Sequence, residues 1–191
     1  MELALFTAYA FISSVTPGPA NVAIFGRASQ KGFRSVLPFV IGVVSGFLVV
    51  LATSEVLVRW GVELAGPFYL ALKIVGSLYL LYLAYRLWRE AGVETTPSTS
   101  IVTGLGAGFL VHVTSLKAWL FPFIAFTVLV PHENRAITPI AVFWVCAVVS
   151  HLLWAWLGGA AHTYLSPRRI KLINQLSAVM LAILVVYTLI S

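Results

Sequence analysis

Residues 15–21 read Val-Thr-Pro-Gly-Pro-Ala-Asn and interrupt an apolar stretch that would otherwise cover residues 3–25. The two prolines lack a backbone donor and the glycine between them lowers helix propensity, so an unbroken helix is not expected here. A second interruption falls in residues 113–119, which read Val-Thr-Ser-Leu-Lys-Ala-Trp. Val, Thr and Ala recur between the two segments at one spacing of 98 (15 to 113, 16 to 114, 20 to 118). The two halves of the chain therefore resemble copies of one unit, each with a broken helix.

The composition of the chain indicates a membrane protein. Of its 191 residues 60% are hydrophobic and only 9% are charged, whereas a soluble domain carries about 25% charged residues. The single cysteine, Cys146, excludes an intramolecular disulfide and argues against paired-thiol chemistry. No histidine or cysteine cluster has metal-ligand spacing and no nucleotide-binding motif follows a strand, so we expect no metal and no cofactor. The basic residues flank apolar stretches instead of forming one patch, so we expect no nucleic-acid partner.

Six apolar stretches are long enough to cross a hydrocarbon core of about 30 Å. They cover residues 3–25, 36–57, 67–85, 101–130, 137–161 and 170–190. Three spans in each half is an odd number, so the second copy enters the bilayer upside down. We therefore predict an all-α membrane protein with six transmembrane helices as an inverted 3+3 repeat, broken in the first and fourth helices. Residues 1–191 form one transmembrane transporter domain, with repeats of about 1–90 and 101–191, and secondary transporters place their substrate at such breaks.

The Lys and Arg residues predict the orientation of the spans. Eight fall in loops on one side: Arg27, Lys31, Arg34, Arg86, Arg89, Arg168, Arg169 and Lys171. The opposite side has only Arg59 and Arg135. Because positive loops stay in the cytoplasm, both termini are expected to face the periplasm.

The break in the first span is the first candidate for a substrate site. Pro17, Gly18 and Pro19 free backbone carbonyls inside the bilayer, which neighbours, water or a ligand must satisfy. Thr16 and Asn21 add polar groups beside them. The alternative is a packed proline kink satisfied by other helices. The matching interruption in the second half favours the substrate site.

The second break carries a charge inside the membrane. Lys117 lies near the centre of the fourth span, beside Thr114 and Ser115. A charge there costs at least about 2.5–3.5 kcal/mol, so it is expected to face a cavity or a partner. Such a lysine can bind a carboxylate or move a proton. The alternatives are a snorkelling lysine or a structural pair.

Glycines and histidines inside the spans have simpler interpretations. Gly42 and Gly46 form a GxxxG motif, expected to pack the second span against the first or third, or to make a homodimer contact. Gly104 opens the fourth span as a hinge or a close-packing position. His112 and His151 can relay protons near neutral pH, but hydrogen-bonded core histidines are the expected reading.

With these residues the sequence resembles the LysE/RhtB family of small amino-acid exporters. The resemblance covers nearly the whole chain and is carried by residues 16–21, 26–35, 42–46, 73–83 and 117–121. It implies a six-helix exporter of the bacterial inner membrane, driven by proton exchange. Two positions depart from the family pattern. Ser115 and Leu116 stand where the family usually has Asn-Pro before the lysine, and Phe47 replaces a common aspartate.

The leading hypothesis is a secondary transporter that exports an amino acid or close derivative by proton antiport. Its partners are then a small-molecule amino-acid substrate, the lipid bilayer and a proton. The motif for ATP binding is missing, so an ion or proton gradient supplies the energy. A second hypothesis is a non-transporting membrane scaffold or modulator, in which Lys117 pairs with a fixed protein anion. An intramembrane enzyme ranks last, because paired carboxylates, an HExxH helix and a Ser/His dyad at suitable spacing are missing.

Overall fold

The computed structural model describes residues 3–60, 67–90, 104–130 and 137–190, and every regular element in these ranges is a helix. In chain order they are α1 (Leu3–Val15), α2 (Pro19–Lys31), α3 (Phe33–Arg59), α4 (Pro67–Glu90), α5 (Leu105–Val113), α6 (Leu116–Ile124), the π-helix η1 (Ala125–Leu129), α7 (Ile137–Tyr164) and α8 (Pro167–Ile190).

The first predicted span is two helices, α1 and α2, separated at residues 16–18. Pro19 takes the first helical position of α2, where its missing N–H costs nothing. The helix then runs past the predicted end of the span to Lys31. Arg27 was expected in a loop, and that expectation is wrong. It lies within α2 with 7% of its surface exposed, and its guanidinium carbon is 4.2 Å from the centre of the Phe39 ring, a cation–π contact.

The fourth predicted span is also divided, although no proline lies at its break. Helix α5 ends at Val113 and α6 begins at Leu116, and the path bends by 56° between them. The backbone N–H and the hydroxyl of Thr114 both donate to the Leu110 carbonyl, at 2.9 and 2.7 Å. Ser115 then adopts an extended conformation. A threonine that bonds back to its own helix helps to end it here.

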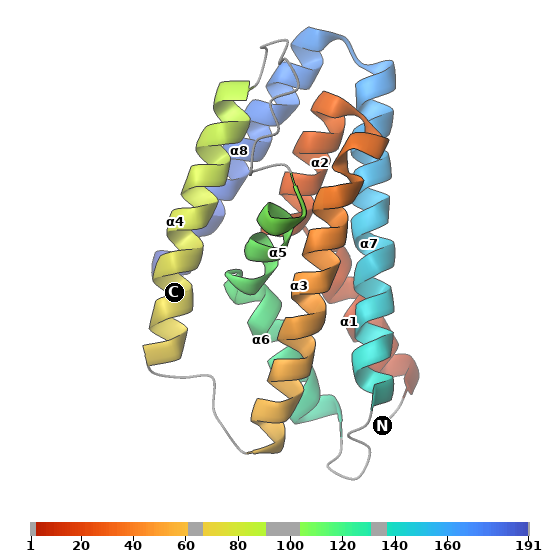
Figure 1. The fold of residues 1–191 in the computed structure, drawn as a ribbon, viewed down its shortest axis with the longest axis vertical. Coiled ribbons are helices and arrows are strands. Elements are labelled where there is room, and N and C mark those ends of the chain that lie inside the picture. The colour runs from red at the N-terminus through yellow and green to blue at the C-terminus, as the bar shows by residue number, and fades with distance from the viewer. Residues whose placement is uncertain (1–2, 61–66, 91–103, 131–136, 191) are drawn as a thin grey trace.

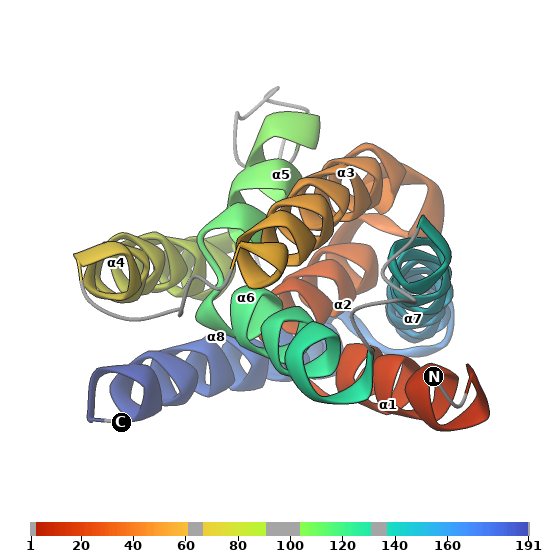
Figure 2. The same cartoon turned by 90° about the horizontal axis from the view of Figure 1, so that it is seen from below.

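The helix directions alternate through the bundle (Figure 1). In the orientation of that figure, α1 and α2 rise, α3 descends and α4 rises, whereas α5 and α6 descend, α7 rises and α8 descends. Figure 2 shows α4 and α8 together at one side and α1 and α7 at the other, with α2 and α6 near the centre. Helix α3 packs on α5 and α7, α2 packs on α7, and α4 packs on α8.

Two of the described helices, α3 and α7, are long and apolar enough to cross a membrane alone. The bent pair from Leu105 to Leu129 makes a third if it counts as one span. Helix α1 is apolar but has only 13 residues. Helices α4 and α8 carry basic residues near one end, including Arg89 and Arg168.

Glycines bring two helix pairs into backbone contact. A Cβ on Gly42 would collide with the Leu105 carbonyl, and one on Gly46 would lie 2.7 Å from the Phe109 carbonyl oxygen. The GxxxG motif therefore packs within the chain, but against α5 in the fourth predicted span and not against the first or third. Gly158 of α7 makes the corresponding approach to α2, where a Cβ would lie 2.5 Å from the Phe25 carbonyl oxygen.

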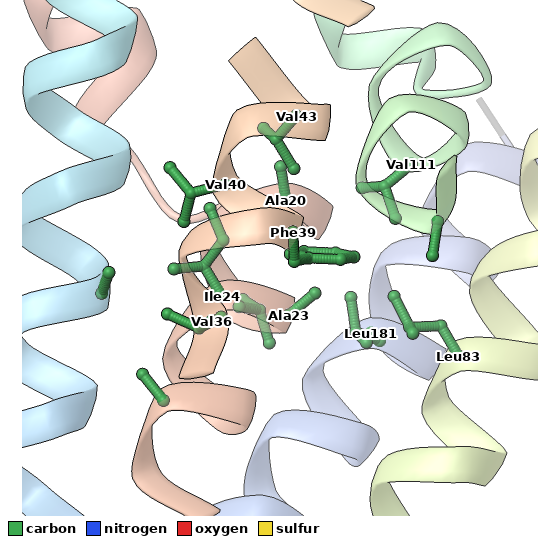
Figure 3. Packing of buried hydrophobic residues seen from close by; sticks show 14 of the residues in the cluster. Ala20, Ala23, Ile24, Val36, Phe39, Val40, Val43, Leu83, Val111 and Leu181 are labelled. Atoms are coloured by element: carbon green, nitrogen blue, oxygen red, sulfur yellow. The ribbon is translucent and has the colours of Figure 1, made fainter. Parts of the chain in front are cut away.

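Two apolar clusters fill the bundle. The upper cluster lies toward the junctions of α2 with α3 and of α7 with α8, and includes Ile24, Phe39, Val43, Leu83 and Leu181. In Figure 3 the ring of Phe39 points from α3 toward Leu83 and Leu181. The lower cluster includes Phe6, Leu51, Phe126 and Phe143. Both helix breaks lie between the two clusters, near mid-height in Figure 1.

Candidate functional site

A pocket lies where the two broken helices meet. Its empty space is about 420 Å³, a volume that includes the part open to the outside. Small, aromatic and polar side chains share its wall: Ser13, Ser14, Gly18, Pro19, Ala20, Asn21, Phe47, His112, Ser115, Lys117, Ala118, Phe121, Pro122, Phe143, Ala147 and His151.

Lys117 connects the two breaks. Its ammonium nitrogen donates to the Thr16 carbonyl oxygen at 2.8 Å and contacts the Thr16 hydroxyl at 2.9 Å. The aliphatic part of the side chain crosses Gly18, where a Cβ would lie 2.9 Å from the lysine Cδ. Within the described residues no carboxylate pairs with this ammonium group. The one intramembrane charge of the pocket is therefore held by uncharged oxygens.

The carbonyls of Ser14, Val15 and Thr16, at the end of α1 and in the break, accept hydrogen bonds from side chains, as buried helix ends require. Asn21 donates from its amide nitrogen to the carbonyls of Ser14 and Thr16, at 2.8 and 3.0 Å. From α7, Ser150 donates to Ser14 at 2.8 Å and Trp154 to the Val15 carbonyl at 3.2 Å. This first break is thus fastened to α7 by several hydrogen bonds.

A similar bond stabilises the second break. The indole nitrogen of Trp119 donates to the Val113 carbonyl at 2.8 Å. Trp119 is 98 positions after Asn21, the spacing that relates the two sequence segments. Each break is therefore closed by the side chain at the same position of its segment, although the two residue types differ.

Helices α2 and α6 both begin at the pocket and run away from it in opposite directions (Figure 1). Gly18 and Ser115 are their N-cap residues, and in the described structure neither N-terminus receives a side-chain cap. The free N–H groups of a helix N-terminus carry partial positive charge. Two such ends and the Lys117 ammonium make this pocket suited to an anionic group.

Two histidines form the inner wall of the pocket. His112 of α5 and His151 of α7 are buried, with 7% and 3% of their surfaces exposed, and their ring centres are 5.3 Å apart. His151 Nδ1 lies 2.7 Å from the Asn21 amide oxygen. The ring of Phe47 packs on His112 at 4.6 Å.

The structure brings most of the predicted site residues together. Gly18, Pro19, Asn21, Ser115 and Lys117 line the pocket, and Thr16 binds the lysine. Pro17 and Thr114 lie in the breaks but not in the wall.

The predicted glycines lie elsewhere. Gly42 and Gly46 belong to the α3–α5 contact, and Gly104 caps α5 with no described atom within 4 Å of its Cβ position.

Sequence reasoning treated His112 and His151 as core residues; both are buried, and both also line the pocket. It also missed the aromatic residues of the lower wall, Phe121 and Phe143. Tyr9 covers them, because its hydroxyl lies 3.2 Å from the Phe121 carbonyl oxygen and its ring contacts both phenylalanines. The two polar histidines inside an apolar chain were the available signal.

Comparison with known proteins finds relatives that align with nearly the whole chain. A relative from Klebsiella pneumoniae subsp. pneumoniae, named cysteine/O-acetylserine efflux protein, is 28% identical over 97% of this chain and 93% of its own length. Relatives of that name from Salmonella typhimurium and Escherichia coli are 26% and 24% identical, covering 98% and 97% of this chain and 95% and 94% of the relatives. No solved structure matches significantly.

The family model for the LysE type translocator matches residues 11–191. Its members are translocators and not enzymes. This assignment and the apolar helices support a multi-pass protein of the inner membrane. The chain belongs to the LysE type translocator family.

Proposed function

We propose that the protein is a secondary transporter that exports an amino acid or a close derivative across the bacterial inner membrane in exchange for protons. One observation carries this proposal. Lys117 of the second break binds Thr16 of the first break, beside a pocket where two half-helix N-termini meet. The substrate carboxylate is the anion that this arrangement fits.

The carboxylate competes with Thr16 for the lysine. A charge-assisted bond from an ammonium group to a carboxylate is stronger than one to a carbonyl or a hydroxyl. The start of α2 is kept open to the substrate by Pro17, Gly18 and Pro19. Asn21 stabilises the break through its hydrogen bonds to the carbonyls of Ser14 and Thr16. On the other side, Thr114 and Ser115 shape the start of α6. Substrate binding then replaces the Lys117–Thr16 contact between the breaks with contacts from both breaks to one ligand.

Alternating access follows from the two repeats, about 1–90 and 101–191, acting in one transmembrane domain. The opposite helix directions of the two halves support the inverted six-span arrangement, with α1–α2 and α5–α6 as the broken spans. Helix α3 packs on its counterpart α7 and α4 on its counterpart α8. The upper apolar cluster separates the pocket from one end of the bundle, and the lower cluster separates it from the other. Opening one cluster while the other stays closed moves the site between the two sides.

The charge distribution supports an orientation with the upper end of Figure 1 in the cytoplasm. Lys31 and Arg34 lie where α2 meets α3, and Arg168 and Arg169 lie where α7 meets α8. All four side chains are exposed. Both chain termini then face the periplasm. Exposed apolar side chains such as Leu48, Val149 and Ile183 face lipid in this arrangement.

The relatives suggest the first substrate to test. They are named as efflux proteins for cysteine and O-acetylserine, two small amino acids with a free carboxylate. The pocket wall contains no Asp or Glu in the described structure, which disfavours an additional positive charge on the substrate side chain. L-Cysteine, kept reduced, is therefore our first probe.

The scaffold hypothesis predicts a fixed protein anion on Lys117 and no polar pocket at the breaks. The observed partners of Lys117 are the uncharged oxygens of Thr16, and the pocket contains four polar side-chain types. Both features favour the transporter. A homodimer through the GxxxG motif is also disfavoured, because Gly42 and Gly46 are occupied by α5.

Exchange of radiolabelled L-cysteine by proteoliposomes tests the proposal. Lys117→Ala removes a charge-assisted bond of about 1.5–3 kcal/mol, so we expect exchange at low substrate concentration to fall roughly 10- to 100-fold. Lys31→Ala, an exposed change at the end of α2, is the matched control and keeps the wild-type rate. Equal rates for K117A and wild type at equal incorporation would contradict the role of the lysine. A wild-type protein that exchanges no amino acid of a broad panel would support the scaffold.

A further inference from the structure

Coupling to protons requires a group near the pocket that can hold one, and this chain offers few. It has no aspartate, and its six glutamates are Glu2, Glu55, Glu63, Glu90, Glu94 and Glu133. Only Glu55 falls inside a predicted span. Its carboxylate is paired with Arg59 at 2.7 Å, near the end of α3, and it is not part of the pocket wall. The described pocket wall therefore offers no carboxylate as the proton carrier.

The histidine pair of the pocket has unused proton-binding capacity. Within the described residues, His112 Nδ1 and His151 Nε2 are buried and have no hydrogen-bond partner. Buried polar atoms are normally satisfied, and an exception calls for a ligand, water or proton. Two such atoms occur on neighbouring rings in the wall of one pocket. This pairing is hard to explain by packing alone.

The hydrogen bonds of Asn21 fix which nitrogen of His151 is basic. The Asn21 amide nitrogen uses both of its hydrogens on the carbonyls of Ser14 and Thr16. The amide oxygen is then an acceptor, so His151 Nδ1 must carry the hydrogen that lies between them. In the neutral ring the lone pair is consequently on Nε2. Nε2 is the atom without a partner.

An amino acid brings a cation as well as an anion into the pocket. The carboxylate has Lys117 and the two helix N-termini, but no carboxylate side chain of the described wall is available for the α-ammonium group. A neutral imidazole nitrogen accepts a hydrogen bond from an ammonium group, whereas an imidazolium ion has no lone pair and repels it. The same nitrogen can therefore bind the substrate's ammonium group or a proton, but not both.

We propose that His151, together with His112, binds the α-ammonium group of the substrate and the coupling proton in alternation. This inference rests on the proposed function and adds the group that makes export an antiport. On the periplasmic side a proton from external water binds Nε2 and the ammonium group of the substrate leaves. After the pocket turns inward, Nε2 releases the proton to cytoplasmic water and the next substrate binds.

The surroundings of the pair leave few other groups to titrate. Lys117 of α6 is the charged group that faces the pocket with the two histidines. The pocket residues of α1, α2 and α3 are Ser13, Ser14, Asn21, Phe47 and small residues, none of which titrates near neutral pH. The N-termini of α2 and α6 contribute fixed partial charges. A response of exchange to acidification therefore belongs to the histidine pair.

The first test uses wild-type protein and two ligands that differ by one group. Unlabelled L-cysteine and 3-mercaptopropionate, which lacks the α-amino group, compete with labelled L-cysteine in exchange at equal pH on both sides. Acidification should raise the half-inhibitory concentration of L-cysteine by up to about tenfold per pH unit once the proton competes. The value for 3-mercaptopropionate should not rise. Equal pH dependence of the two ligands would overturn the proposal.

The second test separates coupling from binding. Liposomes with an acidic lumen should accumulate L-cysteine through the wild-type protein. His151→Gln keeps a side-chain oxygen for the ammonium group and a donor for Asn21, but it cannot carry a proton. We expect H151Q to retain exchange within about tenfold of wild type and to lose accumulation. His162→Gln on the same helix is the control. His162 is exposed and is not part of the pocket wall, and its Nδ1 lies 3.1 Å from the Ser29 carbonyl oxygen.

The outcomes distinguish failure of the histidine proton carrier from failure of the proposed amino-acid export. If H151Q still accumulates L-cysteine in the acidic lumen, the histidine pair is not the proton carrier, and the proposed export function is unaffected. Wild-type exchange that does not respond to pH has the same consequence. If the wild-type protein exchanges neither L-cysteine nor any other amino acid at any pH, the proposed function fails as well.

Discussion

Lys117 shows how one residue can hold two distant segments in a defined relation. Its contact with Thr16 joins positions 101 residues apart. Placing a charge at this depth costs several kcal/mol unless it has partners or a polar cavity, and here it has both. Because the partners are uncharged, the lysine remains available to an anion. A stronger partner would have fixed it in place.

Gly18 lets the lysine reach its partners, and its substitution is a selective test of that contact. The backbone of Gly18 is extended, so alanine fits its conformation. The new Cβ would lie 2.9 Å from Cδ and 3.1 Å from Nζ of Lys117, which can move because they are the flexible end of the side chain. We expect G18A to fold and to lower L-cysteine exchange about tenfold by displacing the ammonium group.

Gly104→Ala is the matched control for this substitution, because no described atom lies within 4 Å of its Cβ position. Melting temperature in detergent and exchange in liposomes should be measured together. A G18A protein with unchanged exchange would show that the position of Lys117 is not critical. A G18A protein that does not fold would place the glycine in packing instead.

At the residue scale the sequence allowed part of the site to be predicted. Gly18 was identified because it stands between two prolines, and Lys117 and Asn21 because charged and amide side chains are rare in apolar stretches. The partner of His151 is Asn21, 130 positions away, and spacing along the chain does not reveal that contact. Packing of α2 on α7 creates it. Histidines of this kind therefore look like core residues until the fold is known.

Among the elements, the two breaks were predicted for different reasons. The first follows from its two prolines. The second has no proline and was predicted only because it repeats the first. In the structure, Thr114 ends α5 and Trp119 bonds across the gap. Local helix propensity does not predict this second break, because the Trp119–Val113 hydrogen bond forms only once the chain has bent.

The contact between α3 and α5 gives a prediction for an element pair. A Cβ on Gly42 would collide with the backbone of Leu105, which cannot rotate away as a side chain can. Gly42→Ala should therefore push the helices apart and cost about 1–3 kcal/mol. For a chain of this size we expect the melting temperature in detergent to fall by roughly 2–10 °C.

Gly106→Ala is the control on α5, since no described atom lies near its Cβ position. Its melting temperature should not fall, because alanine also favours a helix over glycine. A G42A protein as stable as G106A would mean that the two helices separate without loss. The sequence indicated a close contact at Gly42, but the pairing partner and the matching contact at Gly158 depended on the three-dimensional arrangement.

Over the whole molecule, the predicted six apolar stretches all correspond to helices in the described residues, and the first and fourth are each divided into two. Helix α2 carries Arg27 inside the bundle, and α1 is too short to cross a membrane alone. Hydropathy predicted where the helices are, and the two repeated segments predicted where the first and fourth spans divide. The helix directions alternate along the chain in Figure 1, and the inverted 3+3 repeat stays a proposal.

Orientation in the membrane is the prediction that belongs to the molecule as a whole. Exposed basic residues gather at the upper end in Figure 1, at the α2–α3 and α7–α8 junctions and at Arg89 of α4. Because basic segments resist translocation, this end should remain in the cytoplasm and the C-terminus should be periplasmic. Alkaline phosphatase fused after residue 191 should be active and green fluorescent protein fused there should be dark, whereas fusions after residue 90 should give the reverse pattern. Fluorescence from the C-terminal fusion would place both termini in the cytoplasm and would contradict this orientation.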